Sequence, residues 1–183
     1  HAMKKFSHPG SKSREPADLN RAIENTVLVA SNEWRYVAVV DTELDEDLPL
    51  APCYAQDINQ VLLNLIVNAA HAIEAKNGAN QTDKGTITIA TSYDKETVSI
   101  AVSDTGCGIK AEHLDRVFDP FFTTKDVGKG TGQGLSMAYR SIVDLHGGTL
   151  TATSEPGRGA TFTVRLPLTD LPDDSLRAQG RAA

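Results

Sequence analysis

The segment at residues 55–76 constrains the fold of this chain more than any other stretch of its sequence. That segment repeats apolar residues at helical spacing, which predicts a long helix with one apolar stripe. Such a stripe must be buried against another layer of structure, so we expect the helix to lie across a sheet. The residues of the stripe are Ile58, Val61, Leu62, Leu65, Ile66, Ala69 and Ile73.

The sheet is predicted from runs that alternate apolar and polar residues. Residues 86–90 and 98–102 alternate in this way around a charged turn, which indicates a β-hairpin. A second pair of strands is expected at residues 149–153 and 161–166, joined by a glycine-containing turn that hairpin chemistry explains by itself. A further strand is expected at residues 36–40, followed by an acidic loop.

Three further helices complete the expected fold. Asp18 suits the N-cap of a helix that ends near Trp34. A short helix is expected within residues 111–117, and another runs from about 135 to 146, where two glycines stop it. The elements interleave without a strict β-α-β rhythm, and at least one hairpin is antiparallel. The predicted fold class is therefore α+β: a two-layer α/β sandwich with a mixed β-sheet and helices packed on one face.

Length and composition fit one domain of an ordinary globular protein, since the chain has 183 residues with 40% hydrophobic and 23% charged residues. The formal charge of -6, without clustered Lys and Arg, argues against a nucleic-acid partner. No apolar run approaches the ~20 residues that span a bilayer, and the start does not resemble a secretory signal. Cys53 and Cys107 lack metal or disulfide-framework spacing. We therefore expect no membrane contact by this chain and a cytoplasmic location.

The two ends of the chain are expected to lie outside the domain. His1, Ala2 and Met3 resemble a vector-derived remnant, and residues 1–16 are interpreted as this remnant plus a linker. Residues 17–168 are the predicted domain, and residues 169–183 are predicted to be a flexible C-terminal tail.

Four polar residues form a line on another face of the long helix: Gln60, Asn64, Asn68 and His71. Asparagine is a poor mid-helix residue because its amide competes for the backbone, and a solvated face more often carries charged residues. Side-chain carbonyl oxygens one turn apart suit a hard cation such as Mg²⁺, which binds through oxygens alongside phosphates. A solvated face remains the alternative interpretation.

The sequence VSDTGCGI places an acid at the end of a predicted strand, with two glycines directly after it. Asp104 can accept a hydrogen bond from an exocyclic amine there, while Gly106 and Gly108 let the backbone approach a flat ring. A simple turn is the alternative, because Asp-x-Gly is a common turn sequence. Together with Ala111, these glycines also match a relaxed dinucleotide pattern, which we discount because no second strand ending in an acid follows.

Glycines recur at every second position from Gly128 to Gly134, immediately before a predicted helix. Free N–H groups and the positive end of the helix dipole are then offered to an anion, which suits a polyphosphate. The run lacks the G-K-[ST] ending of a P-loop. A lid that closes on a ligand and a merely flexible loop both remain open. Charge and hydroxyl groups are added by Thr124, Lys125, Lys129 and Thr131.

Five segments, taken in order, resemble the N, G1, F, G2 and G3 boxes of the histidine-kinase ATP-binding domain: NLIVNAAHAI, SDTGCGI, FDPFFTTK, GKGTGQGLSMA and GRGATF. This domain has the Bergerat fold, which is shared with gyrase B, MutL and the large heat-shock chaperones. The match covers about residues 55–167, and the order of the boxes makes it specific. The wording of NAAHAI and FDPFFTTK resembles the nitrogen-sensor-like group of kinases.

The resemblance implies ATP and Mg²⁺ as cofactors and a role for each matching residue. Asn64 and Asn68 would hold Mg²⁺ and the phosphates, with Asn64 and Lys125 as the catalytic residues. Asp104 would accept a hydrogen bond from the adenine amino group, and Thr161 would support the adenine pocket. Phe118 and Phe122 would anchor the ATP lid. The expected cofactor-binding residues are Asn64, Asn68, His71, Asp104, Gly106, Gly108, Ile109, Phe122, Thr124, Lys125, Gly130, Thr131, Gly132, Gln133, Gly134, Leu135 and Thr161.

Two features bear on the class of enzyme. Gyrase-type ATPases carry a Glu one turn before the Asn that matches Asn68, and this Glu is the base for the attacking water. This chain has Asn64 at that position. The expected acceptor is therefore a protein histidine. Neither His113 nor His146 has the setting of a phosphoacceptor, and His8 lies in Ser-His-Pro-Gly, which breaks a helix. We interpret the chain as a catalytic fragment that does not phosphorylate itself.

The function implied by the resemblance is the ATP-binding catalytic domain of a two-component sensor histidine kinase. It would transfer the ATP γ-phosphoryl to a histidine on a separate dimerisation and phosphoacceptor hairpin of the same parent protein, with a response regulator downstream. The parent is either soluble or membrane-anchored. A nucleotide-binding module without transfer activity and a gyrase-type ATPase are the alternatives; the intact boxes disfavour the first, and Asn64 disfavours the second.

Overall fold

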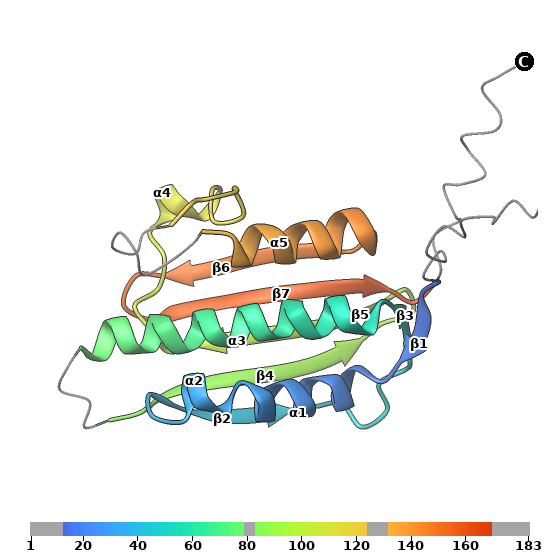
Figure 1. Cartoon of the computed structure of the whole chain (residues 1–183), viewed down its shortest axis with the longest axis horizontal. Helices are drawn as coiled ribbons and strands as arrows, with labels where there is room; N and C mark the ends of the chain where they lie inside the picture. The colour runs from blue at the N-terminus through green and yellow to red at the C-terminus, as the bar shows by residue number, and fades with distance from the viewer. Residues whose placement is uncertain (1–12, 79–82, 124–131, 170–183) are drawn as a thin grey trace, which may run out of the picture.

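The computed structural model describes residues 13–78, 83–123 and 132–169. Strands β2, β4, β5, β7 and β6 form a five-stranded sheet in that order, and β1 pairs with β3 separately. Helices α1, α3 and α5 lie beside one another in a single layer over the sheet (Figure 1). The elements in chain order are β1 (Glu15–Ala17), α1 (Leu19–Val29), α2 (Ser31–Trp34), β2 (Ala38–Glu43), β3 (Ala51–Cys53), α3 (Ala55–Asn77), β4 (Gly85–Tyr93), β5 (Thr97–Asp104), α4 (Ala111–Leu114), α5 (Gly134–Arg140), the π-helical turn η1 (Ser141–Leu145), β6 (Thr149–Glu155) and β7 (Gly159–Pro167).

The sheet is mixed, as predicted. Strand β2 runs parallel to β4, whereas β4–β5, β5–β7 and β6–β7 are antiparallel pairs. The predicted hairpin is β4–β5, and Asp94 closes its turn by accepting the backbone N–H groups of Glu96 and Thr97 at 2.8 Å each. Strand β5 runs from this turn to Asp104, so Asp104 lies at the end of the sheet opposite to the turn.

Helix α3 fills the centre of the two-layer core. Every residue of its predicted apolar stripe is at most 4% exposed. The stripe belongs to one cluster with inward-facing residues of the sheet, including Ile87, Ile100 and Val164. Burying a large aliphatic side chain stabilises a fold by about 1.5–3 kcal/mol, so this stripe fixes the helix firmly on the sheet. The line of polar residues is thereby held in a defined direction.

The N-terminal part of the chain departs from the expected boundaries. Asp18 is the N-cap of α1, as predicted, because it accepts the N–H of Arg21 at 3.0 Å. The expected single helix to Trp34 is wrong, since it breaks at Ala30 into α1 and α2. Strand β2 starts two residues later than predicted and continues into the acidic segment expected as a loop. Pairing with β4 supplies its hydrogen bonds, and such tertiary pairing overrides local propensity.

Two short strands were absent from the sequence prediction. Strands β1 and β3 pair antiparallel, with Glu15 opposite Cys53 and Ala17 opposite Ala51. Each is three residues long and contains a proline, so neither has the length or alternation that marks a strand. Strand β1 overlaps the end of the segment interpreted as a linker.

The helix expected at residues 135–146 is present, but its last turn is widened. It consists of α5 followed directly by η1, and we refer to the two together as the α5–η1 helix. Gly147 has a φ of 65°, a left-handed conformation that ends the helix as the two glycines predicted. The turn η1 is followed at once by the buried His146.

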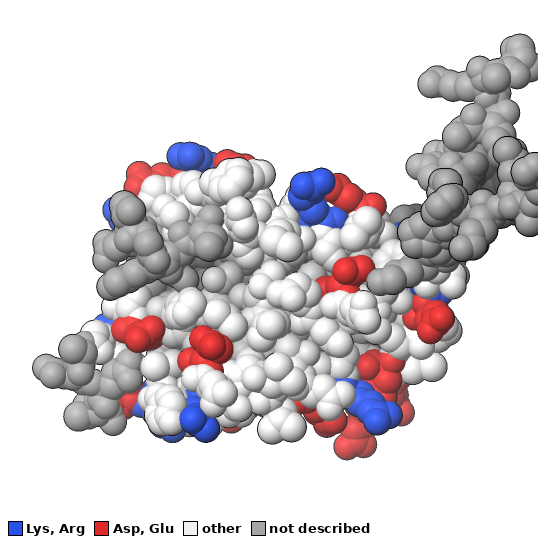
Figure 2. All heavy atoms as spheres, in the orientation of Figure 1, with Lys and Arg blue, Asp and Glu red and all other residues white. Residues whose placement is uncertain are grey.

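The helical face carries most of its charged side chains around its margin, and the area over the middle of the helix layer is largely uncharged (Figure 2). Within the described residues, no helix is both long and apolar enough to cross a membrane.

Candidate functional site

The predicted site residues of α3 face the start of α5. Asn64 donates its side-chain N–H to the backbone oxygen of Gly134, at 3.1 Å. Its own side-chain oxygen accepts a hydrogen bond from Gln60, also at 3.1 Å. The amide of Asn64 therefore joins the long helix to the helix that follows the glycine run. Both residues were predicted to belong to one site, and the structure brings them together.

Asn68 and His71 continue the same face of α3 toward its C-terminal end, and both are half-buried. Among the described residues, the side chain of Asn68 makes no hydrogen bond. Its oxygen is thus more available to a ligand than that of Asn64.

Asp104 lies at the end of β5 and is 8% exposed. Its carboxylate accepts the N–H of Gly106 at 2.7 Å, which fixes the turn after the strand. Burial raises the pKa of this carboxyl, while the N–H groups of Gly106 and Ala160 and the charge of Lys76 act in the opposite direction. Buried acids with a raised pKa are frequent at functional sites, which makes Asp104 a candidate ligand-binding group.

The glycines after Asp104 are needed for close packing. A Cβ on Gly106 would lie 2.5 Å from the backbone carbon of Ala72 in α3. A Cβ on Gly108 would lie 2.2 Å from the backbone oxygen of Glu155, and Gly108 has a φ of 70°. The Asp104 turn is therefore pressed between α3 and the β6–β7 hairpin. These glycines permit the close packing that holds the carboxylate in place.

Ile109 and Thr161 border the same region from different sides. The N–H of Ile109 is held by the hydroxyl of Ser154 at 2.8 Å, and its side chain packs against the core. The hydroxyl of Thr161 lies 2.8 Å from that of Ser103. Since side chains alternate along a strand, Ser103 and Thr161 lie on the face of the sheet opposite to the Asp104 carboxylate. Thr161 nevertheless lines the same open cleft as Asp104, at the end of the sheet.

The aromatic residues of the predicted lid region split into two groups. Phe118 packs against Tyr139 of α5 and Phe162 of β7, with ring centroids 5.2 Å and 6.3 Å away. Phe122 lies against His113, 5.5 Å between centroids. Phe118 is thus anchored in the core, while Phe122 lies on the adjoining α4 region.

A backbone hydrogen bond joins the described residues on the two sides of the predicted lid. The N–H of Phe121 donates to the backbone oxygen of Gly132 at 3.0 Å, and both residues have positive φ angles, 66° and 64°. A Cβ on Gly132 would come within 2.5 Å of Phe121, so only glycine permits this approach. The predicted residues Thr124, Lys125, Gly128, Gly130 and Thr131 lie outside the described residues.

The remaining predicted residues lie at the start of the α5–η1 helix. Gln133 is exposed, and Leu135 packs against the hydrophobic core. Gly134 has open surroundings, because an added Cβ would meet nothing nearer than Asn64 at 3.7 Å. Internal packing therefore does not explain the choice of glycine at this position.

An open cleft of about 720 Å³ runs along the end of the sheet beside Asp104. It is bordered by the turn between β6 and β7 and by two basic residues, Lys76 and Arg158. Lys76 donates to the backbone oxygen of Thr105 at 2.7 Å. Sequence reasoning missed Lys76; its only signal was a basic residue in the last turn of the helix.

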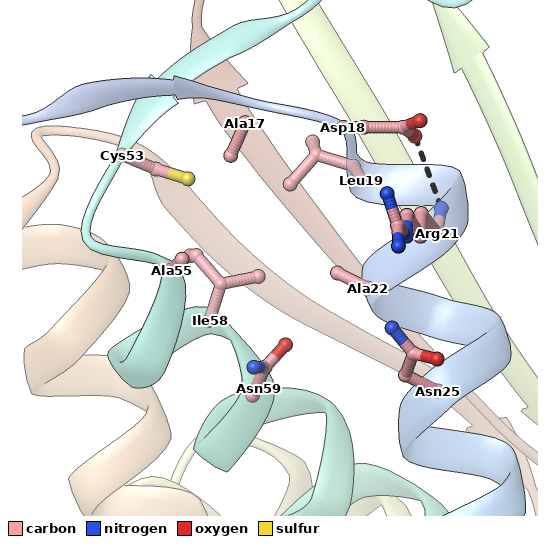
Figure 3. A pocket seen from close by; sticks show the side chains of 10 residues that line it. All are labelled: Ala17, Asp18, Leu19, Arg21, Ala22, Asn25, Cys53, Ala55, Ile58 and Asn59. Atoms are coloured by element: carbon pink, nitrogen blue, oxygen red, sulfur yellow. Dashed lines mark hydrogen bonds between the residues drawn. The ribbon is translucent and has the colours of Figure 1, made fainter.

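A smaller cavity of about 300 Å³ lies between the N-terminal ends of α1 and α3, where Asn25 and Asn59 project from the two helices (Figure 3). None of the predicted site residues lines it. Cys53 borders this cavity, and burial raises the pKa of its thiol to about 11, which leaves it a thiol at neutral pH. Within the described residues, no cluster of His, Cys, Asp and Glu suits a metal ion. The Asp104 region is thus the better candidate site.

Known proteins resemble this chain in sequence and in fold. A family model described as "Histidine kinase-, DNA gyrase B-, and HSP90-like ATPase" matches residues 53–170, more than half of the chain. The chain belongs to this ATPase family. The matched segment contains α3, the Asp104 turn and the α5–η1 helix, and it ends just after β7.

Relatives of this ATPase-family domain are sensor histidine kinases. The signal transduction histidine-protein kinase AtoS of Escherichia coli K12 is 37% identical over 166 residues, covering 89% of this chain and 25% of AtoS. The sensor histidine kinase ZraS of the same strain is 35% identical, covering 87% of this chain and 32% of ZraS. The chain thus spans about a quarter to a third of these relatives.

A solved structure gives the same assignment. The catalytic domain of histidine kinase ThkA, in a nucleotide-free form, aligns with a TM-score of 0.71 and 28% identity, covering 85% of this chain and 98% of that domain. The predicted α+β fold and the predicted type of domain are confirmed: it is an ATP-binding catalytic domain of the histidine-kinase kind. The nitrogen-sensor-like subgroup stays a prediction.

Proposed function

We propose that this domain binds ATP with Mg²⁺ between α3, the Asp104 turn and the start of α5, and transfers the γ-phosphoryl to a histidine on a separate helical hairpin. The observation that carries the proposal is the bridge from Asn64 to the backbone oxygen of Gly134. It joins the two elements that would contact the phosphates. The Asp104 carboxylate lies beyond the C-terminal half of α3, where the base would bind.

The chemistry of Asp104 supports an adenine partner. A carboxylate oxygen accepts hydrogen bonds only, so it matches the exocyclic amine of adenine and repels the carbonyl oxygen at the same position of guanine. Burial strengthens this discrimination, because water competes poorly for the carboxylate. The neighbouring Gly106 packs against the backbone of Ala72 and so fixes the turn that carries the acid.

Asn68 fits Mg²⁺ better than Asn64 does. Mg²⁺ takes oxygen ligands and is held in nucleotide sites by few side chains together with phosphates and waters. The oxygen of Asn64 already accepts a hydrogen bond from Gln60, whereas the Asn68 side chain has no such bond among the described residues. When bound, the metal would neutralise phosphate charge; the protein residues would orient the nucleotide.

Transfer to a protein rather than to water follows from the chemistry of the Asn64 position. Phosphoryl transfer needs mainly positioning and charge neutralisation. Hydrolysis also needs a group that orients or deprotonates water, and an amide is not a base. The Asn64 amide is in addition occupied at both its oxygen and its nitrogen. We propose that the protein binds ATP stably until an acceptor histidine is presented.

Partners and location follow from this proposal. A solved structure shows histidine kinase ThkA in complex with the response regulator TrrA, at 27% identity to this chain. We propose a response regulator as the downstream partner here, an acceptor hairpin in the same parent protein, and a cytoplasmic location, where ATP is available. Lys125, outside the described residues, is proposed to reach the phosphates.

Titration calorimetry and phosphate release test the proposal together. We expect ATP to bind in the presence of Mg²⁺, with weaker binding of GTP and without multiple-turnover release of phosphate. Equal affinity for ATP and GTP would remove the role of Asp104. Rapid, repeated hydrolysis by the wild-type chain would assign it instead to the water-using ATPases of the family.

A further inference from the structure

The two helices that meet at the proposed nucleotide site are also joined where α3 begins and the α5–η1 helix ends. At the site, Asn64 of α3 bonds Gly134 at the start of α5. At the far end, Nε2 of His146 accepts the backbone N–H of Tyr54, the residue before α3, at 3.0 Å. About ten residues of α3, or roughly 15 Å, separate the two connections. Helix α3 and the α5–η1 helix thus form a closed frame.

His146 is built into this frame from three sides. It is 1% exposed, and Nδ1 donates to the backbone oxygen of Ser141 at 2.7 Å. Its ring meets the Tyr54 ring edge-on, with centroids 5.3 Å apart. Because Nε2 accepts an N–H, the imidazole must be neutral with its proton on Nδ1. Protonation would put a second donor against the N–H of Tyr54 and break the connection.

The electrostatic surroundings agree with a neutral ring. Burial lowers the pKa of His146, and the bond to Ser141 acts in the opposite direction. Two charged groups influence it: Arg14, just before β1, lowers the pKa, and Asp57 in the first turn of α3 raises it.

The segment that leads into the domain touches both halves of this connection. The guanidinium of Arg14 donates to the backbone oxygen of Leu145, the last residue of η1. It also lies 5.9 Å from the centroid of the Tyr54 ring. Strand β1 follows directly and pairs with β3, which ends one residue before Tyr54. We call the contacts among Arg14, Tyr54, Leu145 and His146 the latch.

We propose that the latch sets the alignment of α3 with the α5–η1 helix and thereby controls the affinity of the nucleotide site. Arg14 and His146 are then positioning residues that act through the frame. The inference rests on the proposed function, because it concerns the regulation of the same site. Packed helices carry such coupling because they move as rigid bodies between discrete arrangements.

The latch is suited to opening because its polar groups are incompletely paired. Nη1 of Arg14 and the hydroxyl of Ser141 are buried, and neither has a hydrogen-bond partner among the described residues. Opening would return both groups to water, which offsets part of the cost of the bonds that break.

Calorimetry with ATP and Mg²⁺ on three variants tests the latch. We expect Arg14→Gln and His146→Leu to weaken ATP binding about fivefold or more, the lower end of ordinary coupling between sites. The matched control is Arg140→Gln, on the same helix, whose exposed side chain pairs only with Asp144 among the described residues; it should bind like the wild type. Folded latch variants with wild-type affinity would overturn the inference.

Two further readouts separate positioning from simple loss of stability. In His146→Gln, the side-chain oxygen can accept the N–H of Tyr54, so we expect affinity to recover at neutral pH. Wild-type affinity should fall as the pH falls from 7 to 5, and that of His146→Gln should fall less. Identical pH profiles would count against the latch, and this variant also keeps the test valid if His146→Leu does not fold.

Hydrogen exchange without nucleotide distinguishes this inference from the proposed function. The latch predicts faster exchange at residues 132–138 in Arg14→Gln, although these residues lie at the far end of the frame. Exchange that increases only near residues 141–147 would overturn it. A wild-type chain that binds no ATP would overturn the proposed function, while faster exchange at 132–138 in the variant would still support the latch.

Discussion

Replacing Asp104 with Asn tests the adenine site with little disturbance of the fold. The substituted side chain keeps an oxygen that can accept the N–H of Gly106, now at 2.7 Å, so the turn after β5 should survive. The second carboxylate oxygen becomes an NH2 group. This group is a donor, so it cannot accept the hydrogen bond of the adenine amine. Losing a charge-assisted hydrogen bond costs ~1.5–3 kcal/mol, which corresponds to about 10- to 150-fold weaker binding of ATP.

The chain offers a matched control at the other end of the same strand. Asp94 also holds a turn by accepting backbone N–H groups, those of Glu96 and Thr97, but it lies in the turn before β5. Titration calorimetry should show weakened ATP binding for Asp104→Asn and unchanged binding for Asp94→Asn. Equal affinities for wild type and Asp104→Asn, or equal losses in the two variants, would refute the reasoning.

Three further predictions follow from the geometry. Gly106→Ala should destabilise the fold by about 1–3 kcal/mol in urea unfolding, because its Cβ would meet the backbone of Ala72 at 2.5 Å. Gly134→Ala should leave stability unchanged or slightly raised, since its Cβ has room, yet calorimetry should show weaker ATP binding if phosphates approach there. The pKa of His146 is lowered in the fold, so the stability it contributes is present above the ordinary pKa of 6.5 and is lost as the pH falls through the folded pKa. The free energy of unfolding in urea should therefore fall less between pH 7 and 5 for His146→Leu than for the wild type. An equal fall in the two proteins would contradict this role of His146.

Local patterns predicted the parts of the fold that a single element determines. The apolar stripe of α3 and the alternation in β4 and β5 each indicated an element and its buried face, because periodicity follows directly from helix and strand geometry. Strands β1 and β3 could not be predicted, since three residues with a proline have no period. Strand β2 was displaced because its pairing with β4 extends into an acidic segment that has no strand propensity of its own.

The candidate site shows the same division. Asn64 and Asn68 were predicted as site residues because asparagine is a poor mid-helix residue, and Asp104 was predicted because it is an acid at a strand end followed by glycines. The bond between Asn64 and Gly134 joins residues 70 positions apart, and the contact of Gly106 with Ala72 depends on how the turn meets α3. His146 was recognised only as not being a phosphoacceptor, because a sequence gives no sign that both ring nitrogens are engaged. Thr161 was expected at the adenine pocket and lines the same open cleft as Asp104, and the strand register that pairs it with Ser103 is a tertiary property.

Transfer of radiolabelled γ-phosphate tests the central claim most directly. The chain would be mixed with ATP, Mg²⁺ and a separately prepared helical hairpin that carries the acceptor histidine of its parent protein. The account predicts acid-labile label on the hairpin, no label on this chain alone, and little free phosphate without the hairpin. Acid-labile label on this chain alone, or phosphate released over many turnovers in the absence of the hairpin, would contradict it.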